Sequence, residues 1–313
     1  MRAAFNVERA EGAGICARDK EAKMAAPKNI QAIDLMINIP TDEHNAAGYA
    51  AFRAMQRDDE SLKNFHMPAQ YLFKNIPSLG ADPTKFVDAI VAEMDKHNVA
   101  IAMIPLSDAL RHPEIAERFA DRFVFHSAVD PNKGMEEVRR IRQAHREHGI
   151  KALTYFPAAS LPQVGINDKE MYPIYAAAVD LDLPIIVNVG MPGPRLPMRT
   201  QHVELIDEVC WFFPELKFVM RHGAEPWVDL AVKLMLKYPN LYYCTSAFAP
   251  KHYPKAIVDY ANKRGADKIM YAGYFPAGLS LDRIFAELDN VPFKDEVWPK
   301  FLRENAARVF KLG

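Results

Sequence analysis

The sequence lacks several features that mark large classes of proteins. It has only three cysteines in 313 residues, Cys16, Cys210 and Cys244, and their wide spacing excludes a disulfide framework and a zinc knuckle. The formal net charge of −1 gives no basic excess for nucleic acid or for an anionic membrane surface. No apolar run approaches the length of a membrane span. We therefore expect a cytoplasmic protein whose partner is a small-molecule substrate, with no nucleic acid and no membrane.

The common short motifs of catalysis and nucleotide binding are also missing. The chain has no P-loop, no serine-nucleophile elbow and no Cys-x-x-Cys. A Rossmann fold needs a glycine-rich turn after its first strand, and the segment AIDLMINIPTDEHN (32–45) contains no glycine. Residues 1–29 mix charge with Gly and Ala around no continuous apolar core, so they do not resemble a secretory signal. We expect them to be a loosely ordered extension that precedes one domain over residues 30–313.

What the chain does contain is a regular alternation of short apolar runs and amphipathic stretches. The runs, rich in β-branched residues, are 32–39, 99–106, 123–129, 150–156, 184–190, 217–223, 241–247 and 268–274. Between them lie helical patterns such as residues 82–97 and 135–149, the latter stopping at a glycine. Eight such units predict an α/β fold, a single distorted (β/α)₈ TIM barrel. The long connection 40–81 after the first strand is predicted to be a lid over the barrel mouth.

Signatures that occur in order along the chain resemble the amidohydrolase superfamily. They include Ile33-Asp34 in the first strand, DRFVFHSAVDP (121–131), YPIYAAAVDLDLPIIVNVG (172–190) and FPELKFVMRHGAEPW (213–227). The resemblance covers roughly residues 30–312 and points to the branch with aminocarboxymuconate-semialdehyde decarboxylase and the hydroxybenzoate decarboxylases. It implies an enzyme that is a lyase or a hydrolase, assembled as a homodimer or larger.

The metal site of that family is replaced in this sequence. The resemblance implies four ligand positions: two histidines of strand one, a histidine ending strand five and an aspartate ending strand eight. At these positions the chain has Met36, Asn38, Asn188 and Tyr274. A thioether, two carboxamides and a neutral phenol do not offset the charge of a dication, so we expect no metal and no other cofactor. The alternative is a metal whose ligands are recruited elsewhere, from His44, His66, His202 or Glu225.

The family's histidine on strand six is present as His222. An imidazole can move a proton near neutral pH, and Asn38, Asn188 and Tyr274 can donate hydrogen bonds to a developing oxyanion or enolate. We predict these four residues as catalytic in a metal-independent enzyme. A lyase such as a decarboxylase or hydratase comes first, and an activated-ester or lactone hydrolase second. The competing hypothesis is a non-catalytic ligand-binding barrel, or a partner subunit of an active relative.

Residues predicted to bind the substrate follow the ends of the strands. Arg195 and Arg199, in the loop after the fifth strand, are candidates to hold a substrate carboxylate. A partly apolar mouth is expected to be completed by Tyr155, Met36, Met191 and Ser246. Arg221 directly precedes His222, so strand alternation predicts that its side chain points away from the barrel interior. The substrate is thus predicted to be small and partly apolar, with a carboxylate or a carbonyl.

Overall fold

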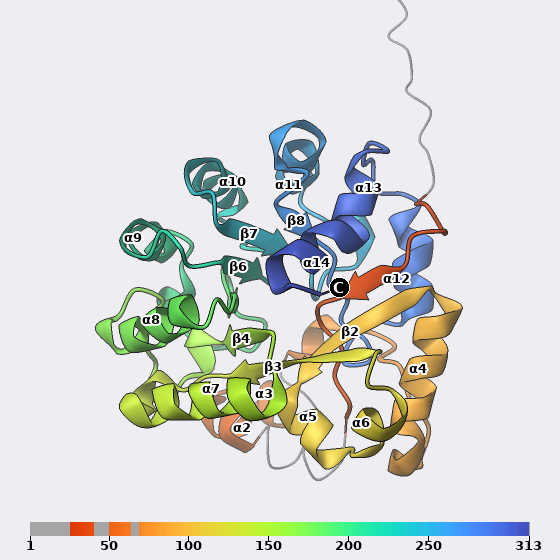
Figure 1. Cartoon of the computed structure of the whole chain (residues 1–313), viewed down its shortest axis with the longest axis horizontal. Helices are drawn as coiled ribbons and strands as arrows, with labels where there is room; N and C mark the ends of the chain where they lie inside the picture. The colour runs from red at the N-terminus through yellow and green to blue at the C-terminus, as the bar shows by residue number, and fades with distance from the viewer. Residues whose placement is uncertain (1–25, 41–49, 64–68, 313) are drawn as a thin grey trace, which may run out of the picture.

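Eight parallel strands follow one another around a barrel in the order of the sequence (Figure 1). The computed structural model describes residues 26–40, 50–63 and 69–312. The strands are β1 (Ala32–Asp34), β2 (Val99–Pro105), β3 (Phe123–Ala128), β4 (Ala152–Tyr155), β5 (Ile185–Asn188), β6 (Phe218–Arg221), β7 (Leu241–Cys244) and β8 (Ile269–Met270). Each lies inside the run that predicted it, and the predicted TIM-barrel fold is confirmed.

The ring is closed where β1 meets the chain that follows β8. A parallel bridge pairs Ile37 with Phe275, and the Asn38 amide donates to the Phe275 carbonyl at 3.3 Å. One Asp34 carboxylate oxygen accepts hydrogen bonds from the amides of Met36, at 2.9 Å, and Gly273, at 2.8 Å. The backbone at Gly273 passes so close that an added Cβ would lie 2.6 Å from the other Asp34 oxygen. A buried carboxyl group therefore joins the first and last strands.

Strand alternation divides the core into an interior and an exterior part. The barrel interior is filled by a cluster that contains Ile33, Leu35, Met103, Ala152, Ile186, Val219, Tyr242, Cys244 and Met270. The same cluster takes in Val309 and Phe310 of the C-terminal helix α14 (Asn305–Phe310). In Figure 1 this helix lies in front of the strands, so it closes the amino end of the barrel. The opposite end, where the carboxyl ends of the strands lie, forms the mouth of the barrel.

The outer face of the strands is covered by helices that bury one apolar side each. They are α4 (Phe86–Lys96), α5 (Leu106–Arg111), α6 (Glu114–Arg118), α7 (Met135–His148), α8 (Tyr172–Asp180), α9 (Leu205–Phe212), α10 (Val228–Lys237), α11 (Lys255–Tyr260), α12 (Leu281–Leu288) and α13 (Val297–Pro299). Asp82 caps the turn before α4 by accepting from the Thr84 amide, and Gly149 ends α7 in the left-handed conformation. None of the described helices is long and apolar enough to cross a membrane.

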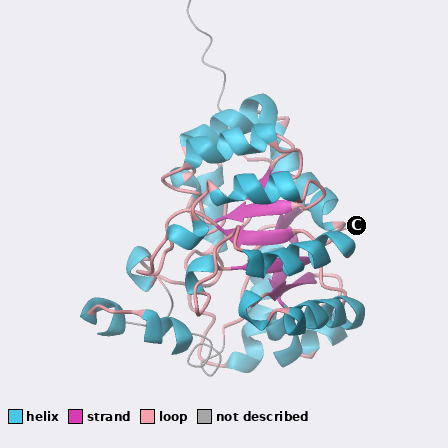
Figure 2. Cartoon of the chain, turned by 90° about the vertical axis from the view of Figure 1, so that its left-hand side faces the viewer, coloured by secondary structure: helices cyan, strands magenta, loops and turns pink. Residues whose placement is uncertain are grey.

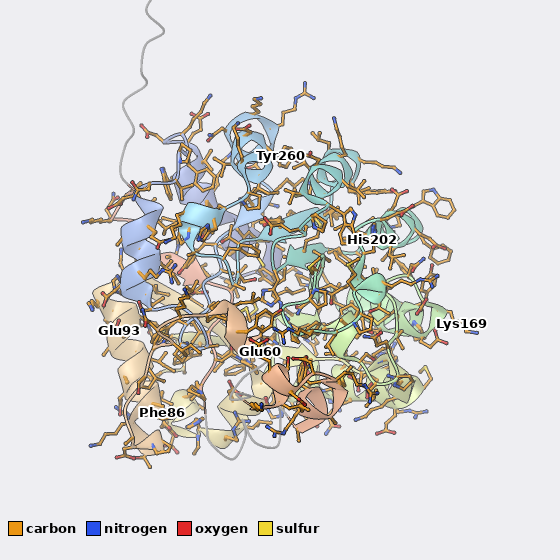
Figure 3. All side chains as sticks on the ribbon, turned by 180° about the vertical axis from the view of Figure 1, so that it is seen from behind. Glu60, Phe86, Glu93, Lys169, His202 and Tyr260 are labelled. Atoms are coloured by element: carbon orange, nitrogen blue, oxygen red, sulfur yellow. The ribbon has the colours of Figure 1, made fainter. Side chains whose placement is uncertain are left out.

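The described parts of the predicted lid lie on the face opposite α14. They include α2 (Ala50–Met55) and α3 (Asp59–Lys63), followed by a helical turn at Gln70–Leu72. In Figure 3, the view from behind, Glu60 of α3 lies over the central part of this face, and in Figure 2 short helices project from that side. Residues 41–49 and 64–68 of the lid, and residues 1–25 of the predicted extension, fall outside the described residues.

Candidate active site

A cavity of about 540 Å³ opens at the carboxyl end of the strands, between the lid and the loops after β5 to β8. Four predicted site residues line it: Asn188, Met191, His222 and Tyr274. The other walls are mainly apolar, with Leu72, Phe73, Phe156, Phe248 and Leu279 among the lining residues. A few polar side chains facing a mostly apolar wall are typical of a small-molecule site.

His222 follows the last residue of β6 and has a backbone φ of +69°. Its imidazole Nδ1 lies 3.1 Å from the buried hydroxyl of Ser246, and its ring meets that of Tyr274 edge to face with centroids 5.8 Å apart. Burial, and then the nearby charge of Arg221, hold the pKa of His222 well below its usual value of 6.5. The imidazole is therefore neutral at physiological pH and fixed in orientation.

Arg221 points into the barrel, and the prediction that it turns outward was wrong. Val219 belongs to the interior cluster and Met220 to the outer one, so alternation brings Arg221 inward. The positive φ at His222 then breaks the alternation, and both consecutive side chains reach the mouth. Arg221 lies beside Asn188 in the β5–β6 register, and its Nε donates to Asn188 Oδ1 at 2.8 Å.

Several polar groups surround the Arg221 guanidinium. Burial of His126 on β3, and then the charge of Arg221, lower the pKa of His126 to about 3. Burial of the Cys244 thiol on β7 raises its pKa to about 11, and the charge of Arg221 opposes this rise. Burial in turn lowers the pKa of Arg221 itself, with Cys244 and Tyr274 acting in the opposite direction. Arg221 is thus a buried cation within electrostatic range of groups from β3, β6, β7 and the segment after β8.

Tyr274 connects the site to the lid. Its ring stacks on Phe73 with centroids 5.1 Å apart, while its other neighbour is the imidazole of His222. Phe73 and Tyr274 both line the cavity, and both pack close to Gly278, where an added Cβ would lie 2.6 Å from each ring. The position of the phenol therefore depends on how the segment around Phe73 is seated.

Three residues predicted to contact the substrate lie elsewhere. Tyr155 is on the outer face of β4, buried, and donates its hydroxyl to the Val164 carbonyl at 2.7 Å. Arg195 forms ion pairs with Asp58 and Glu60 of the lid. Arg199 is exposed and is not among the residues that line the cavity. Tyr155 is excluded from the mouth because Leu153 and Tyr155 share the outward parity of the strand.

The remaining predicted residues are close to the mouth without lining this cavity. Met36 packs against the interior cluster, and Asn38 follows it two residues later on the same side of the extended chain. Ser246 is fully buried and reaches His222, so its geometry suits holding the imidazole more than contacting a substrate. The cavity therefore unites His222, Asn188 and Tyr274, whereas Asn38 is not among the residues that line it.

The donor set does not fit the divalent metal that the fold family implies. Asn188 Oδ1 already accepts a hydrogen bond from a guanidinium, whose charge would repel a dication. Of the alternative ligands, His44 and His66 lie outside the described residues, and His202 packs on Trp227 with ring centroids 3.8 Å apart. Glu225 lines the cavity as one carboxylate.

One group of possible metal donors lies elsewhere in the part of the chain that the structure describes. It consists of Glu93 and His97 on α4 with Asp282 on α12. Lys96 already pairs with Asp282 at 2.7 Å, and Glu93 lies at the outer edge of the molecule in Figure 3. This group is remote from the mouth, and its carboxylates already pair with Lys96 and His97.

Comparison with known proteins places the fold in a recognised group. A family model described as amidohydrolase matches residues 67–312. A TIM-barrel protein from Bordetella bronchiseptica superposes with a TM-score of 0.69 at 20% identity, over 90% of this chain and 98% of that one. A dihydroxybenzoic acid decarboxylase from Polaromonas, solved with manganese and the inhibitor 2-nitroresorcinol, gives 0.61 at 17% identity, over 90% and 97%.

A third solved structure, 5-carboxyvanillate decarboxylase from Sphingomonas paucimobilis, gives a TM-score of 0.64 at 14% identity, over 91% of this chain and all of that one. No curated protein matches the chain in sequence. At these identities the likeness shows the shared barrel, so the chemistry has to be argued from the residues of the mouth.

Proposed function

The chain belongs to the amidohydrolase family, and we propose that it is a lyase of this family that acts without a metal ion on a small, partly apolar organic acid. Its site offers a proton-exchanging imidazole and neutral hydrogen-bond donors in a largely apolar cavity. That set suits bond changes next to a carbonyl or an aromatic ring, where the transition state places negative charge on an oxygen.

His222 supplies the acid–base function. Its depressed pKa keeps the imidazole neutral, so that it can act as a base, although a weaker one than an exposed histidine, and makes the imidazolium, once formed, a strong proton donor. Ser246 fixes the ring through Nδ1, which leaves the opposite edge of the imidazole to face the cavity. Asn188 and Tyr274 flank the position where an enol or enolate oxygen would develop.

This set of groups favours some reactions over others. Decarboxylation, hydration and dehydration proceed through enol, enolate or dienolate species, which amide and phenol donors stabilise. Hydrolysis of an activated ester or lactone is the second choice, because such a bond breaks without strong Lewis-acid assistance. Hydrolysis of a stable amide or of a phosphate ester is poorly matched to neutral donors.

The observation that carries the proposal is the backbone at His222. A non-glycine residue at φ +69° is uncommon, and such strain costs on the order of 1 kcal/mol or more. It persists where the surroundings hold it, and here it directs an oriented imidazole into the cavity. The competing reading, a non-catalytic binding barrel, would leave this strained and tightly held geometry without a use.

The test is turnover by two site variants. Against a panel of hydroxybenzoates, unsaturated dicarboxylates and aryl esters, His222→Ala is expected to lose roughly a hundredfold or more in turnover, the scale of a general acid–base group. Tyr274→Phe is expected to lose about ten- to a thousandfold, as for weak to strong oxyanion donors. His148→Ala, an exposed histidine on α7, is the matched control.

If His222→Ala and Tyr274→Phe turn the substrate over at the wild-type rate, the mechanism is wrong. If the wild-type protein binds members of the panel and converts none of them, the non-catalytic barrel becomes the better account. Progress is followed by carbon dioxide release and by ultraviolet absorbance, so that lyase and hydrolase reactions are distinguished.

A further inference from the structure

The buried guanidinium of Arg221 has no carboxylate to balance it among the residues that the structure describes. Its side chain is 9% exposed, and its single hydrogen bond to a described residue runs from Nε to the neutral amide oxygen of Asn188. Other arginines differ: Arg140 pairs with the buried Glu137, and Arg122 pairs with Asp95 at 2.8 Å. Within the described chain, Arg221 is therefore a positive charge at the carboxyl end of the barrel that no carboxylate balances.

Keeping such a charge is unfavourable for folding. An ion buried without a partner carries a desolvation penalty of several kcal/mol that neutral hydrogen bonds offset only in part. A site that must bind an anion gains from the same arrangement, because the cation is already desolvated and held in place before the ligand arrives. A cation that no described carboxylate neutralises is what an anionic ligand requires.

The two terminal nitrogens of the Arg221 guanidinium are the atoms that would bind a carboxylate. Nε is used by Asn188, whereas no described residue accepts from the two terminal nitrogens of the guanidinium. Those two nitrogens form the fork that matches a carboxylate with two parallel hydrogen bonds. Arg221 does not itself line the cavity, but it ends β6 on the interior side, hydrogen-bonded to Asn188 and next to His222, and both of these residues line the cavity.

We propose that Arg221 forms an anion site at the base of the mouth and binds the carboxylate of a small aromatic or unsaturated organic acid. The carbon skeleton of this ligand would lie among the aromatic side chains of the wall, Phe73, Phe156 and Phe248. The proposal deepens the proposed function, since it assigns the acid group of the same substrate class. It replaces Arg195 and Arg199 as the carboxylate-binding residue.

Other cations near the cavity are less suited to this role. Arg283 lines the cavity but pairs with Glu287 at 3.0 Å, and Lys74 is exposed at its rim. Arg195 is occupied by two carboxylates of the lid. Arg221 is buried, is hydrogen-bonded to the cavity-lining Asn188, and has no ion pair with an acidic side chain in the described part of the chain.

The test compares two probes of the same shape and different charge, benzoate and benzamide. Calorimetric titration of the full chain at pH 7.5 should show benzoate binding to the wild-type protein more tightly than benzamide. In Arg221→Gln the benzoate affinity should fall about tenfold to a hundredfold, the scale of a charged hydrogen-bonded pair, with benzamide unchanged. Arg221→Lys should give an intermediate loss, because it keeps the charge and loses the fork.

Arg146→Gln on the outer helix α7 is the matched control, and Arg199→Gln tests the rival position. The proposal is overturned if benzoate does not bind the wild-type protein, or binds Arg221→Gln equally well. It is also overturned if Arg199→Gln shows the larger loss.

A second variant covers the case in which Arg221→Gln does not fold. Asn188→Asp places a carboxylate against the Arg221 guanidinium. The protein should therefore fold, and it should lose benzoate binding because the new carboxylate neutralises the Arg221 charge. Retained benzoate affinity in Asn188→Asp would contradict the anion site. These binding measurements are independent of turnover: if Arg221→Gln keeps wild-type benzoate affinity while His222→Ala loses turnover, the anion site fails and the role of His222 stands. If benzoate binding depends on Arg221 while His222→Ala keeps full turnover, the proposed function fails and the anion site stands.

Discussion

Two arginines, one after β5 and one ending β6, are used in opposite ways. Arg195 lies in the loop after β5, is exposed, and contacts Asp58 and Glu60 of α3 together with the ring of Tyr71, 4.5 Å away. Arg221 is buried and has a neutral amide as its described hydrogen-bond partner. Arg195 pairs with carboxylates although it is exposed to water, whereas the buried Arg221 pairs with none of the described carboxylates.

This difference separates a structural charge from a ligand-binding one. Exposed ion pairs are weak individually, and those of Arg195 act together with the hydrogen bond from Tyr71 to the Gly193 carbonyl, at 2.6 Å, to hold the lid against the loop after β5. A buried unpaired cation contributes nothing favourable to folding by itself. The sequence does not distinguish the two, because both arginines follow strands of the same barrel.

The largest expected effect concerns Asp34, a second buried charge without an ion pair. Burial, only partly opposed by the amide hydrogen bonds from Gly273 and Met36, raises its pKa from 3.8 to about 6. The folded state then holds the proton more tightly than the unfolded state, so stability falls as pH rises from about 4 to about 6. The cost above pH 6 is about 3 kcal/mol, at 1.36 kcal/mol per pKa unit.

Asp34→Asn keeps an oxygen for the amides of Met36 and Gly273 and removes the charge. Denaturant unfolding at pH 4.5 and pH 7 should show that the variant lacks this loss of stability, so that it gains on the wild-type protein at pH 7. An identical pH dependence in both proteins would show that Asp34 does not titrate in this window.

The next effect is on the pH dependence of His222. The catalytic form is neutral, so activity is lost as pH falls through the pKa of His222, which lies well below 6.5. Arg221→Gln removes one cause of the depression, so the acid limb of kcat/KM should move to higher pH. The position of the limb and the imidazole resonances in NMR both report this change. No shift in either would place Arg221 too far from His222 to act on it.

A smaller effect is expected for Arg195→Gln. The ion pairs with Asp58 and Glu60 are exposed, so benzoate affinity should weaken by less than about fivefold, and the melting temperature should change little. Proteolysis of the lid, followed by mass spectrometry, should become faster. A loss as large as that of Arg221→Gln would invalidate the distinction between the two arginines.

The smallest expected effect is that of a chelator. Since Asn188 Oδ1 is engaged by Arg221 and the other replaced positions are poor donors, dialysis against EDTA should leave the melting temperature and benzoate binding unchanged. A melting temperature that drops with chelator and recovers with zinc would show that metal ligands come from elsewhere in the chain.

Much of the barrel was predictable, because each strand is an apolar run and each connection has a helical period. The convergence of Asn188, His222 and Tyr274 was predictable too, since parallel strands end at the same face. Tyr155 was predicted in the mouth although strand alternation puts it on the same outer face as Leu153. Arg221 was misplaced for a different reason: the positive φ of His222 is fixed by tertiary contacts and has no mark in the sequence.

The partners of Arg195 were equally hidden, because Asp58 and Glu60 are separated from it by more than 130 residues of chain. Long-range ion pairs leave no periodic signal. The lid could be predicted as a long connection, but not which of its side chains would meet the loop after β5.

The stacking of Phe73 on Tyr274 has a consequence for how tightly any ligand is held. Because the phenol is supported by a ring from the lid, the pocket is complete only in molecules whose Phe73 is seated on Tyr274. Observed affinity is the intrinsic affinity multiplied by the fraction of molecules in the seated state. A Phe73→Leu protein would therefore bind a ligand more weakly for two reasons: fewer molecules would hold the phenol in place, and the ligand would lose its contact with the Phe73 ring.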